Sequence, residues 1–556
     1  MTPEQLAQTI VATLATLVDE GALALADGVP ADVRVERPRV REHGDYATNV
    51  AMRVAKQAHR PPREIAELLA ARLVRADGVA TADVAGPGFL NIRVEAGAQG
   101  VLAGEVVAAG AAYGSNATLA GQRVNVEFIS ANPTGPLHLG HTRWAALGDA
   151  LARTLTACGA DVAREFYVND RGAQMDSFGA SLMAAAAGRP VPEDGYHGAY
   201  VRELAERIAS EHPDFADLPD DERLVAYREE GYRLQLAEQQ QQLHAFRTHF
   251  DVWYSERTLH DDDRVEHGIE KLRGLGHLYE ADGALWMRTT DAGDDKDRVL
   301  VRSDGTYTYF ASDTAYYVDK RERGFDRCIY MLGADHHGYV GRLRAMAACA
   351  GDDPDQHIEV LIGQLVRVLR GGRELRLSKR AGTLLGLQEL VDLTGVDALR
   401  YTLCRSPADS PMTVDVETVT RQASDNPVFY VQYAHARLSS ILRNATDLGL
   451  VGPDGPQAYD PTLLDHPREG DLLRALAELP RVVQQAAVLR EPHRVARYLE
   501  STASTFHKFY DECRVLPLGD EDLTDLHRAR LVLVSATKVV VANGLALLGV
   551  TAPERM

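Results

Sequence analysis

Cysteine is scarce in this chain of 556 residues. There are five, an odd number, and no two form a Cys-x-x-Cys pair. Structural zinc sites draw on such pairs, and a disulfide framework needs an even set of cysteines. We therefore expect no zinc and no other metal held by the protein, and we expect a reducing, cytoplasmic location. The cysteines are Cys158, Cys328, Cys349, Cys404 and Cys513.

Long hydrophobic runs are also missing. The longest apolar stretches, such as residues 531–541, contain polar side chains. None approaches the run of roughly 18 apolar residues that crosses a bilayer. The N-terminal segment MTPEQLAQTIVATLATLVDEG has acidic residues within its apolar periodicity and lacks the basic start of a secretory signal. We expect an amphipathic first helix, no transmembrane helix and no membrane partner.

Positive charge is in deficit, with 60 Lys and Arg against 80 Asp and Glu, and a formal net charge of −20. Nucleic acids are bound largely through Lys and Arg contacts to phosphates, so this balance argues against such a partner unless basic residues gather locally. They gather in one segment, which is interpreted equally well as a nucleic-acid contact and as a solvated basic face. Its members are Arg367, Arg370, Arg373, Arg376, Lys379 and Arg380.

The chain is longer than one hydrophobic core usually organises, and its pattern divides into three parts. Residues 1–115 combine a helical opening with short strands, which predicts an α+β domain. Residues 116–414 alternate strand, turn and long helix, which predicts a Rossmann-like, doubly wound parallel sheet. Residues 415–556 are periodically helical, which predicts an all-α bundle. The expected fold is thus multidomain α/β.

A charged, helix-rich segment at about 175–295 interrupts the predicted sheet domain. We interpret it as a helical insertion. Its glutamine-rich part, residues 238–242, is predicted to be the solvated face of a helix rather than a functional element.

The segment ANPTGPLHLGH at residues 131–141 has the pattern of an anion site. An alternating apolar strand runs into a Pro/Gly turn, and a long helix begins near the histidines. Such a turn brings backbone N–H groups and the positive end of the helix dipole to one point. His138 and His141 are three residues apart and fall on one helix face, and Gly140 leaves room for a nucleotide. Taken alone, a His-x-x-His pair is more often structural.

Two motifs together resemble the signatures of class I aminoacyl-tRNA synthetases. HLGH at 138–141 is similar to their HIGH motif, and its extended form is similar to that of the arginyl enzymes. RLSKRAGT at 376–383 resembles the KMSKS loop, with Arg376 and Arg380 replacing its first Lys and last Ser. The resemblance implies that the protein activates L-arginine with ATP and substrate-borne Mg²⁺. It then transfers arginine to the 3′-terminal ribose of tRNA(Arg) and releases AMP.

The resemblance also implies which residues bind ATP and arginine. The catalytic residues are His138, His141 and Lys379, and the nucleotide contacts add Gly140, Asp335, His336 and Ser378. Ser130 and Asn132 hold the amino and carboxylate groups of arginine, Tyr309 and Asp313 hold its guanidinium, and Glu127 lies nearby. A carboxylate can accept two parallel hydrogen bonds from a flat guanidinium. Because side chains at the strand ends of a doubly wound sheet face the ligand crevice, Tyr309 and Asp313 are expected at such a strand end.

Further motifs extend the resemblance over nearly the whole chain. DALRY at 397–401 is similar to a packing signature of this subgroup, and we assign it no chemistry. GPGFLNI at 86–92 resembles the N-terminal domain of arginyl enzymes, which contacts tRNA. There Phe89 stacks on a D-loop base and Asn91 hydrogen-bonds it, although Phe89 fits a core position equally well. The C-terminal bundle resembles an anticodon-binding domain, and the family suggests a monomer.

Two rival functions differ from this one. A cysteinyl synthetase needs zinc-binding cysteines, which the chain lacks. A non-catalytic tRNA-binding relative has no need of His138, His141 and Lys379, all of which are present.

The charge of Lys379 should matter most as negative charge develops on the transferred phosphoryl group. We therefore predict that Lys379→Ala lowers kcat for adenylate formation, with little change in the arginine KM. The cost is that of one oxyanion donor, roughly 2.7–4 kcal/mol. Single-turnover adenylate formation measures it, and full activity of the variant would assign the role to Arg376 or Arg380.

Overall fold

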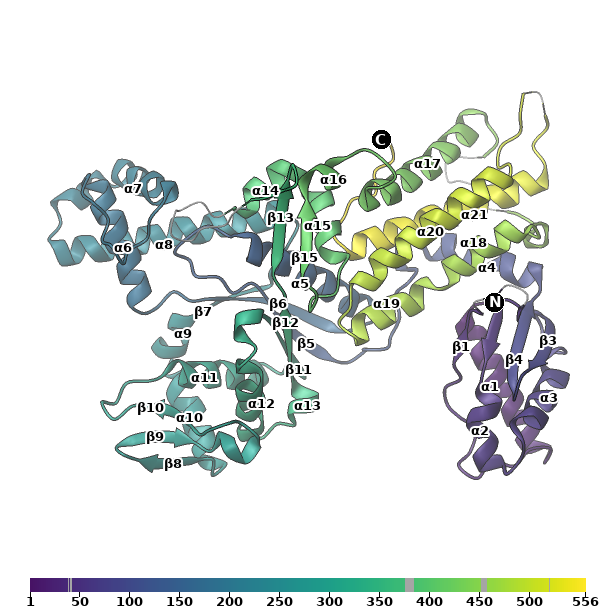
Figure 1. Cartoon of the computed structure of the whole chain (residues 1–556), viewed down its shortest axis with the longest axis horizontal. Coiled ribbons are helices and arrows are strands. Elements are labelled where there is room, and N and C mark those ends of the chain that lie inside the picture. The colour runs from purple at the N-terminus through teal and green to yellow at the C-terminus, as the bar shows by residue number, and fades with distance from the viewer. Residues whose placement is uncertain (39, 41–42, 376–384, 452–457, 520) are drawn as a thin grey trace.

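The computed structural model describes the chain except residues 39, 41–42, 376–384, 452–457 and 520. The predicted signature loop, with Ser378 and Lys379, therefore lies outside the described residues. Figure 1 shows an N-terminal unit beside a helical bundle, and a parallel sheet between that bundle and an outlying group of helices.

The N-terminal unit is a four-stranded antiparallel sheet packed with three helices. Its strand order is β1-β2-β4-β3. In the first helix, Leu6, Ile10 and Leu14 repeat at helical spacing and are fully buried. The elements are α1 (Pro3–Asp19), β1 (Val35–Glu36), β2 (Tyr46–Thr48), α2 (Val50–Ala58), α3 (Pro62–Leu73), β3 (Val79–Ala85) and β4 (Phe89–Val94).

Strand β4 decides between the two interpretations of Phe89. Leu90 and Ile92 point into the core, and the alternate residues face outward. Phe89 is 42% exposed, so its interpretation as a plain core residue is wrong.

The central sheet is parallel throughout, with order β12-β11-β5-β6-β7. The chain moves outward from β5 through β6 to β7 and then returns to β11 on the other side of β5. The switch point therefore lies between β5 and β11, and ligands bind at the carboxyl ends of strands at such a point. The strands are β5 (Arg123–Glu127), β6 (Asp161–Val168), β7 (Val252–Ser255), β11 (Arg327–Gly333) and β12 (Ile358–Gly363).

The predicted doubly wound sheet is confirmed, and its first crossover helix packs closely on it. This helix is α5 (Leu139–Ala157). A Cβ on Gly148 would lie 2.4 Å from the ring of Phe128, so a glycine lets α5 approach the end of β5.

The segment interpreted as a helical insertion is not continuous. It begins as helices, but β7 then returns to the central sheet, and the remainder includes a separate antiparallel sheet of order β10-β9-β8. Strand β7 is only four residues long and lies between helices, so its pattern was too short to identify. The elements are α6 (Ala173–Ala186), α7 (Ala199–Glu211), α8 (Asp220–Ala245), α9 (Glu256–Asp261), α10 (Arg264–Gly274), β8 (Leu278–Ala281), β9 (Ala284–Met287), β10 (Arg298–Val301) and α11 (Tyr309–Glu322).

A second small sheet, of order β14-β13-β15, connects the central sheet to the C-terminal part. The elements of this region are α12 (Tyr339–Cys349), α13 (Pro354–His357), β13 (Val366–Arg370), β14 (Arg373–Glu374), α14 (Leu387–Thr394), α15 (Val396–Cys404), β15 (Met412–Asp415) and α16 (Val416–Thr420).

The C-terminal part is the predicted helical bundle. Its helices are α17 (Pro427–Asp447), α18 (Pro467–Ala477), α19 (Leu479–Val488), α20 (His493–Glu512) and α21 (Asp525–Leu547). Helix α4 (Ala96–Ala109), which the sequence groups with the N-terminal unit, packs against α18 and α21. Helix α21 is long and apolar enough to cross a membrane by length and composition, but 56% of its most apolar window is buried in the structure. Its apolar residues contribute to the bundle core.

The DALRY segment joins the sheet domain to the bundle. Arg400, on α15, is fully buried and donates to Asp149 of α5 at 2.5 Å. It also donates to the backbone carbonyls of Phe246 at 2.8 Å and Leu548 at 3.1 Å, near the ends of α8 and α21. One guanidinium thus connects three elements, which agrees with the interpretation of this motif as packing.

We predict that Arg400→Ala destabilises the protein by about 3–5 kcal/mol, because it leaves the carbonyls of Phe246 and Leu548 without this donor and removes the fully buried partner of Asp149, which then pairs, among the described residues, only with the partly exposed Arg153 and Arg164. Arg405→Ala is the matched control, since it breaks the solvent-accessible pair with Glu500 and should cost less than about 1 kcal/mol. Urea denaturation measures both. Equal losses in the two variants would contradict the role of Arg400.

Candidate active site

The carboxyl end of β5 turns sharply at two residues with left-handed backbone. Ile129 has φ 72° and Ser130 has φ 45°, a conformation that costs free energy for residues other than glycine. The turn aims the Ser130 hydroxyl back at the strand, where it donates to Glu127 at 3.0 Å and accepts from the Tyr167 N–H at 3.2 Å. Strained backbone thus fixes two of the predicted substrate residues against each other.

The two histidines meet at the N-terminus of α5. Their rings stack with centroids 3.8 Å apart. His138 is the N-cap residue: its Nδ1 accepts from the Gly140 N–H at 3.3 Å, and its own N–H donates to Nδ1 of His141 at 3.2 Å. The sequence predicted backbone N–H groups available to an anion, whereas these two are bonded to imidazole. Because Nδ1 accepts in both rings, each neutral ring carries its proton on Nε2.

Gly140 lies close to the His138 ring in the helix cap. A Cβ at this position would lie 3.2 Å from Cε1 of His138, closer than most such contacts, so the ring would have to shift by a few tenths of an ångström. The glycine therefore leaves room for the His138 ring in its capping position.

Acidic side chains converge beside the Ile129–Ser130 turn at the end of β5. The side-chain carboxyl groups of Asp313 and Glu256 form no hydrogen bond or ion pair with any described residue. Burial and then repulsion from Glu127 and Glu256 raise the pKa of Asp313 to about 7, which Arg342 opposes only in part. Burial and then repulsion from Asp170 likewise raise the pKa of Glu256 to about 7, which Arg171 opposes only in part. The structure thus holds two carboxyl groups that lack a paired cation.

The cations behind this acidic group are already committed. Lys320 is fully buried, and its Nζ lies 2.6 Å from Glu127 and 3.9 Å from Glu165. Arg323 donates to both oxygens of Glu165, at 2.7 and 2.9 Å. Burial raises the pKa of Glu165, but Lys320 and Arg323 outweigh that effect and leave this pKa below its ordinary value. The nearby cations thus compensate Glu127 and Glu165.

Tyr309 and Asp313 do not lie at a strand end, and that prediction is wrong. Both are on α11, which begins at Tyr309 with Thr308 as its cap, the Thr308 hydroxyl accepting from the Ala311 N–H at 3.3 Å. Tyrosine and threonine favour strands by propensity, but the cap and the packing of α11 determine a helix here. Their four-residue spacing puts both on one helix face. Tyr309 is 76% exposed.

The remaining predicted residues lie along the same edge of the sheet. Asp335 and His336 are exposed and lie in a short 3-10 helix, Ala334–His336, directly after β11. Nε2 of His336 lies 3.5 Å from Oδ2 of Asp335. Asn132 is exposed, and its Nδ2 donates to Gln174 at 2.8 Å.

The residues that follow the undescribed signature segment return to the histidine turn. Gly386 forms a β-bridge with His138, and the Leu387 N–H donates to the Leu137 carbonyl at 2.9 Å. The described chain after Lys379 is therefore attached directly beside His138.

Three polar residues of this region were not among the site residues predicted from the sequence. Glu256 directly follows β7, so identifying that strand would have placed it at the carboxyl edge of the sheet. Lys320 is seven residues after Asp313 on α11, on a similar side of the helix. Gln239, in the glutamine-rich stretch predicted as solvated, is fully buried. Its signal was the four-residue spacing of Gln235, Gln239 and Leu243, which is the spacing of a buried helix face.

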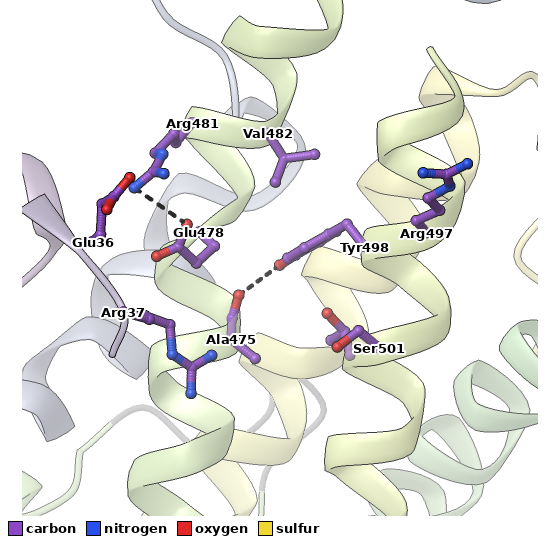
Figure 2. Close-up of a pocket in the computed structure, with 10 residues that line it drawn as sticks. Glu36, Arg37, Ala475, Glu478, Arg481, Val482, Arg497, Tyr498 and Ser501 are labelled. Carbon is purple, nitrogen blue, oxygen red and sulfur yellow. Dashed lines mark hydrogen bonds and ion pairs between the residues drawn. The ribbon is translucent and has the colours of Figure 1, made fainter. Parts of the chain in front are cut away.

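A separate cavity lies between the N-terminal unit and the bundle. It has a volume of about 580 Å³, and Figure 2 shows Arg37 and Glu36 facing Glu478 and Arg481 of the bundle across it. Its lining comes from the end of β1, from Arg37 directly after it, and from α18, α19, α20 and the residue between α18 and α19, and it includes none of the predicted catalytic residues. The cavity belongs to the junction between these two parts.

The parallel sheet, the histidine-capped helix at its switch point and the C-terminal bundle define a class I aminoacyl-tRNA synthetase. Family models match in order: the arginyl tRNA synthetase N terminal domain at residues 4–94, the class I (R) catalytic domain at 104–195 and 219–435, and the DALR anticodon binding domain at 431–556. The chain belongs to the arginyl-tRNA synthetase family.

Full-length relatives support this assignment. The chain is 58% identical to an arginine–tRNA ligase of Frankia alni and 54% identical to one of Renibacterium salmoninarum, in each case over the whole of both chains. Two solved arginyl-tRNA synthetases share the fold over the whole of both chains: that of Thermus thermophilus has TM-score 0.76 at 24% identity, and that of Plasmodium falciparum has TM-score 0.74 at 15% identity.

The pKa values of Asp313 and Glu256 are raised to about 7 in the ligand-free protein, and a guanidinium held by these side chains would bind their ionised forms. We predict that the arginine KM rises as pH falls from 8 to 6, by up to about tenfold per pH unit for each proton displaced. Asp313→Asn should flatten this dependence. Arginine-dependent ATP–pyrophosphate exchange with tRNA present measures it, and the ATP KM is the control. An arginine KM that is constant over this range would contradict the assignment.

Proposed function

We propose that this ligase activates L-arginine with ATP, in the presence of substrate-borne Mg²⁺, and transfers it to the 3′-terminal ribose of tRNA(Arg) with release of AMP. The observation that carries the choice of arginine is the pair of carboxyl groups of Asp313 and Glu256, which have no paired cation among the described residues and lie close to Glu127 at the end of β5. A buried carboxylate is costly without a cation, and the guanidinium of arginine supplies one that is planar and always charged.

Arginine lies along the switch point with its guanidinium toward Asp313. Tyr309 stands one helical turn before Asp313 and lies over the same face. Glu127 is tied to Lys320 through Oε2 and to Ser130 through Oε1, so it contributes as a fixed, partly compensated acceptor. The Ser130 hydroxyl already accepts one hydrogen bond, from the Tyr167 N–H, and its second lone pair accepts a hydrogen bond from the substrate ammonium group. Asn132 contacts the substrate ammonium and carboxylate groups.

The carboxylate of arginine attacks the α-phosphate of ATP, and charge builds on the phosphoryl oxygens. Catalysis then depends on preorganised donors. The Nε2–H groups of His138 and His141 supply two of them, Gly140 keeps the His138 ring in place, and Lys379 supplies a charge. The bridge between Gly386 and His138 supports this role of Lys379 and of Ser378, because it attaches a residue that follows them closely in sequence beside the histidines. Asp335 and His336 flank the nucleotide at the end of β11.

Residues 1–115 contact the outer corner of tRNA, with Phe89 and Asn91 at a D-loop base. Residues 415–556 bind the anticodon arm. The exposure of Phe89 supports the first role, since a stacking side chain must be accessible. The protein acts as a cytoplasmic monomer.

If Asp313 faces the guanidinium, Asp313→Asn removes the opposing charge and preserves shape. Loss of one partner of a buried ion pair costs about 3–5 kcal/mol, so kcat/KM for arginine should fall by roughly 10² to 10³. The kcat/KM for citrulline, the neutral isostere of arginine, should fall far less, so the ratio of the two kcat/KM values should become smaller in the variant. Aminoacylation with each amino acid measures this. A variant within about threefold of wild type for arginine would move the role to Glu127 or Glu256.

If Phe89 stacks on a D-loop base, Phe89→Ala should weaken tRNA binding by about 1–3 kcal/mol, and Phe89→Tyr should preserve it. A tRNA that lacks the base should bind wild type and Phe89→Ala alike. Filter binding at fixed salt measures the four combinations. Equal weakening by Phe89→Ala with both tRNAs would show that Phe89 does not contact that base.

A further inference from the structure

Three helices of the outlying insertion hold the loop that carries Asn132 and leads to His138. Gln239 of α8 donates from Nε2 to the backbone carbonyls of Asn132 at 3.0 Å and Gly135 at 2.8 Å. Tyr200 of α7 donates to the carbonyl of Thr134 at 3.0 Å. Gln174 of α6 accepts from the Asn132 side chain at 2.8 Å. Figure 1 shows α8 running from the outlying helices toward the central sheet.

One side-chain amide, that of Gln239, bridges the backbone carbonyls at the two ends of this turn. Pro133 lies within it and is buried, so the turn is packed as well as bonded.

The chemistry of this bridge is specific to an amide. Both contacts are made by one NH₂ group, which has two donors. Gln239 is fully buried, and without it the two carbonyls would lose a partner that nearby apolar groups cannot supply. A carboxylate in the same place has no donor and would repel both carbonyls.

We propose that Gln239 is a positioning residue for arginine activation. Its amide sets the distance between the ends of the 132–135 turn and so orients the Asn132 side chain toward the arginine site. Through this contact the conformation of the insertion helices reaches the reacting groups. The inference rests on the proposed role of Asn132 in holding arginine.

The test uses the protonation of an engineered carboxyl group. In Gln239→Glu, the ionised side chain should lower kcat/KM for arginine about 10- to 100-fold at pH 8, because a misplaced substrate group costs this much. As pH falls toward 6, the buried carboxyl takes up a proton and regains one donor. The ratio of variant to wild-type kcat/KM should therefore rise at least fivefold. Gln239→Leu should also lower kcat/KM for arginine, but the ratio of its kcat/KM to that of wild type should be independent of pH.

Control variants separate positioning from folding. Gln240→Glu adds the same charge at the exposed neighbouring position and should leave activity unchanged. Tyr200→Phe removes a single bond to the same loop and should cause a smaller loss than Gln239→Leu. If Gln239→Leu does not fold, the pH-dependent ratio of Gln239→Glu still decides.

Two results would overturn the proposal. One is a Gln239→Glu ratio that does not change with pH, and the other is folded Gln239→Leu with kcat/KM within threefold of wild type. Asn132→Ala tests the underlying role separately. If Asn132→Ala is fully active while the Gln239→Glu ratio depends on pH, Gln239 positions the loop but the role assigned to Asn132 is wrong.

Discussion

Excess negative charge at one edge of the parallel sheet is the constraint on which the site depends. Burying like charges is unfavourable unless cations compensate them. Lys320 and Arg323 do so for Glu127 and Glu165, whereas Asp313 and Glu256 are only partly compensated, by Arg342 and Arg171, and their pKa values are raised to about 7. On the proposed function, the guanidinium of arginine supplies the missing positive charge.

The rest of the fold holds this edge in place. The strained turn at Ile129 and Ser130 directs the chain from β5 to the histidine cap. Arg400 ties α5 to the ends of α8 and α21, so the helix that carries the histidines is fixed to both the insertion and the bundle. Tertiary contacts from distant parts of the chain thus determine the geometry of a short loop.

Much of this architecture follows from sequence because its signals are local. The βαβ alternation and the His-x-x-His turn needed only neighbouring residues, whereas the packing role of DALRY came from the family resemblance. Strand β7 was hidden by its length, and with it Glu256. Tyr309 and Asp313 were predicted at a strand end, not on a helix, because residue propensity was stronger than the cap signal at Thr308. The glutamines of α8 were predicted as solvated because their partners, the carbonyls of residues 132 and 135, are over 100 residues away.

The central claim is that a guanidinium supplies the charge that the carboxyl groups lack. Isothermal titration calorimetry of arginine at pH 7, in two buffers with different ionisation enthalpies, tests it directly. Because the pKa values of Asp313 and Glu256 are raised to about 7, both carboxyl groups are partly protonated at that pH, and the account predicts net release of protons on arginine binding. Citrulline, where it binds, should release almost none. An arginine binding enthalpy that is the same in both buffers would contradict the account.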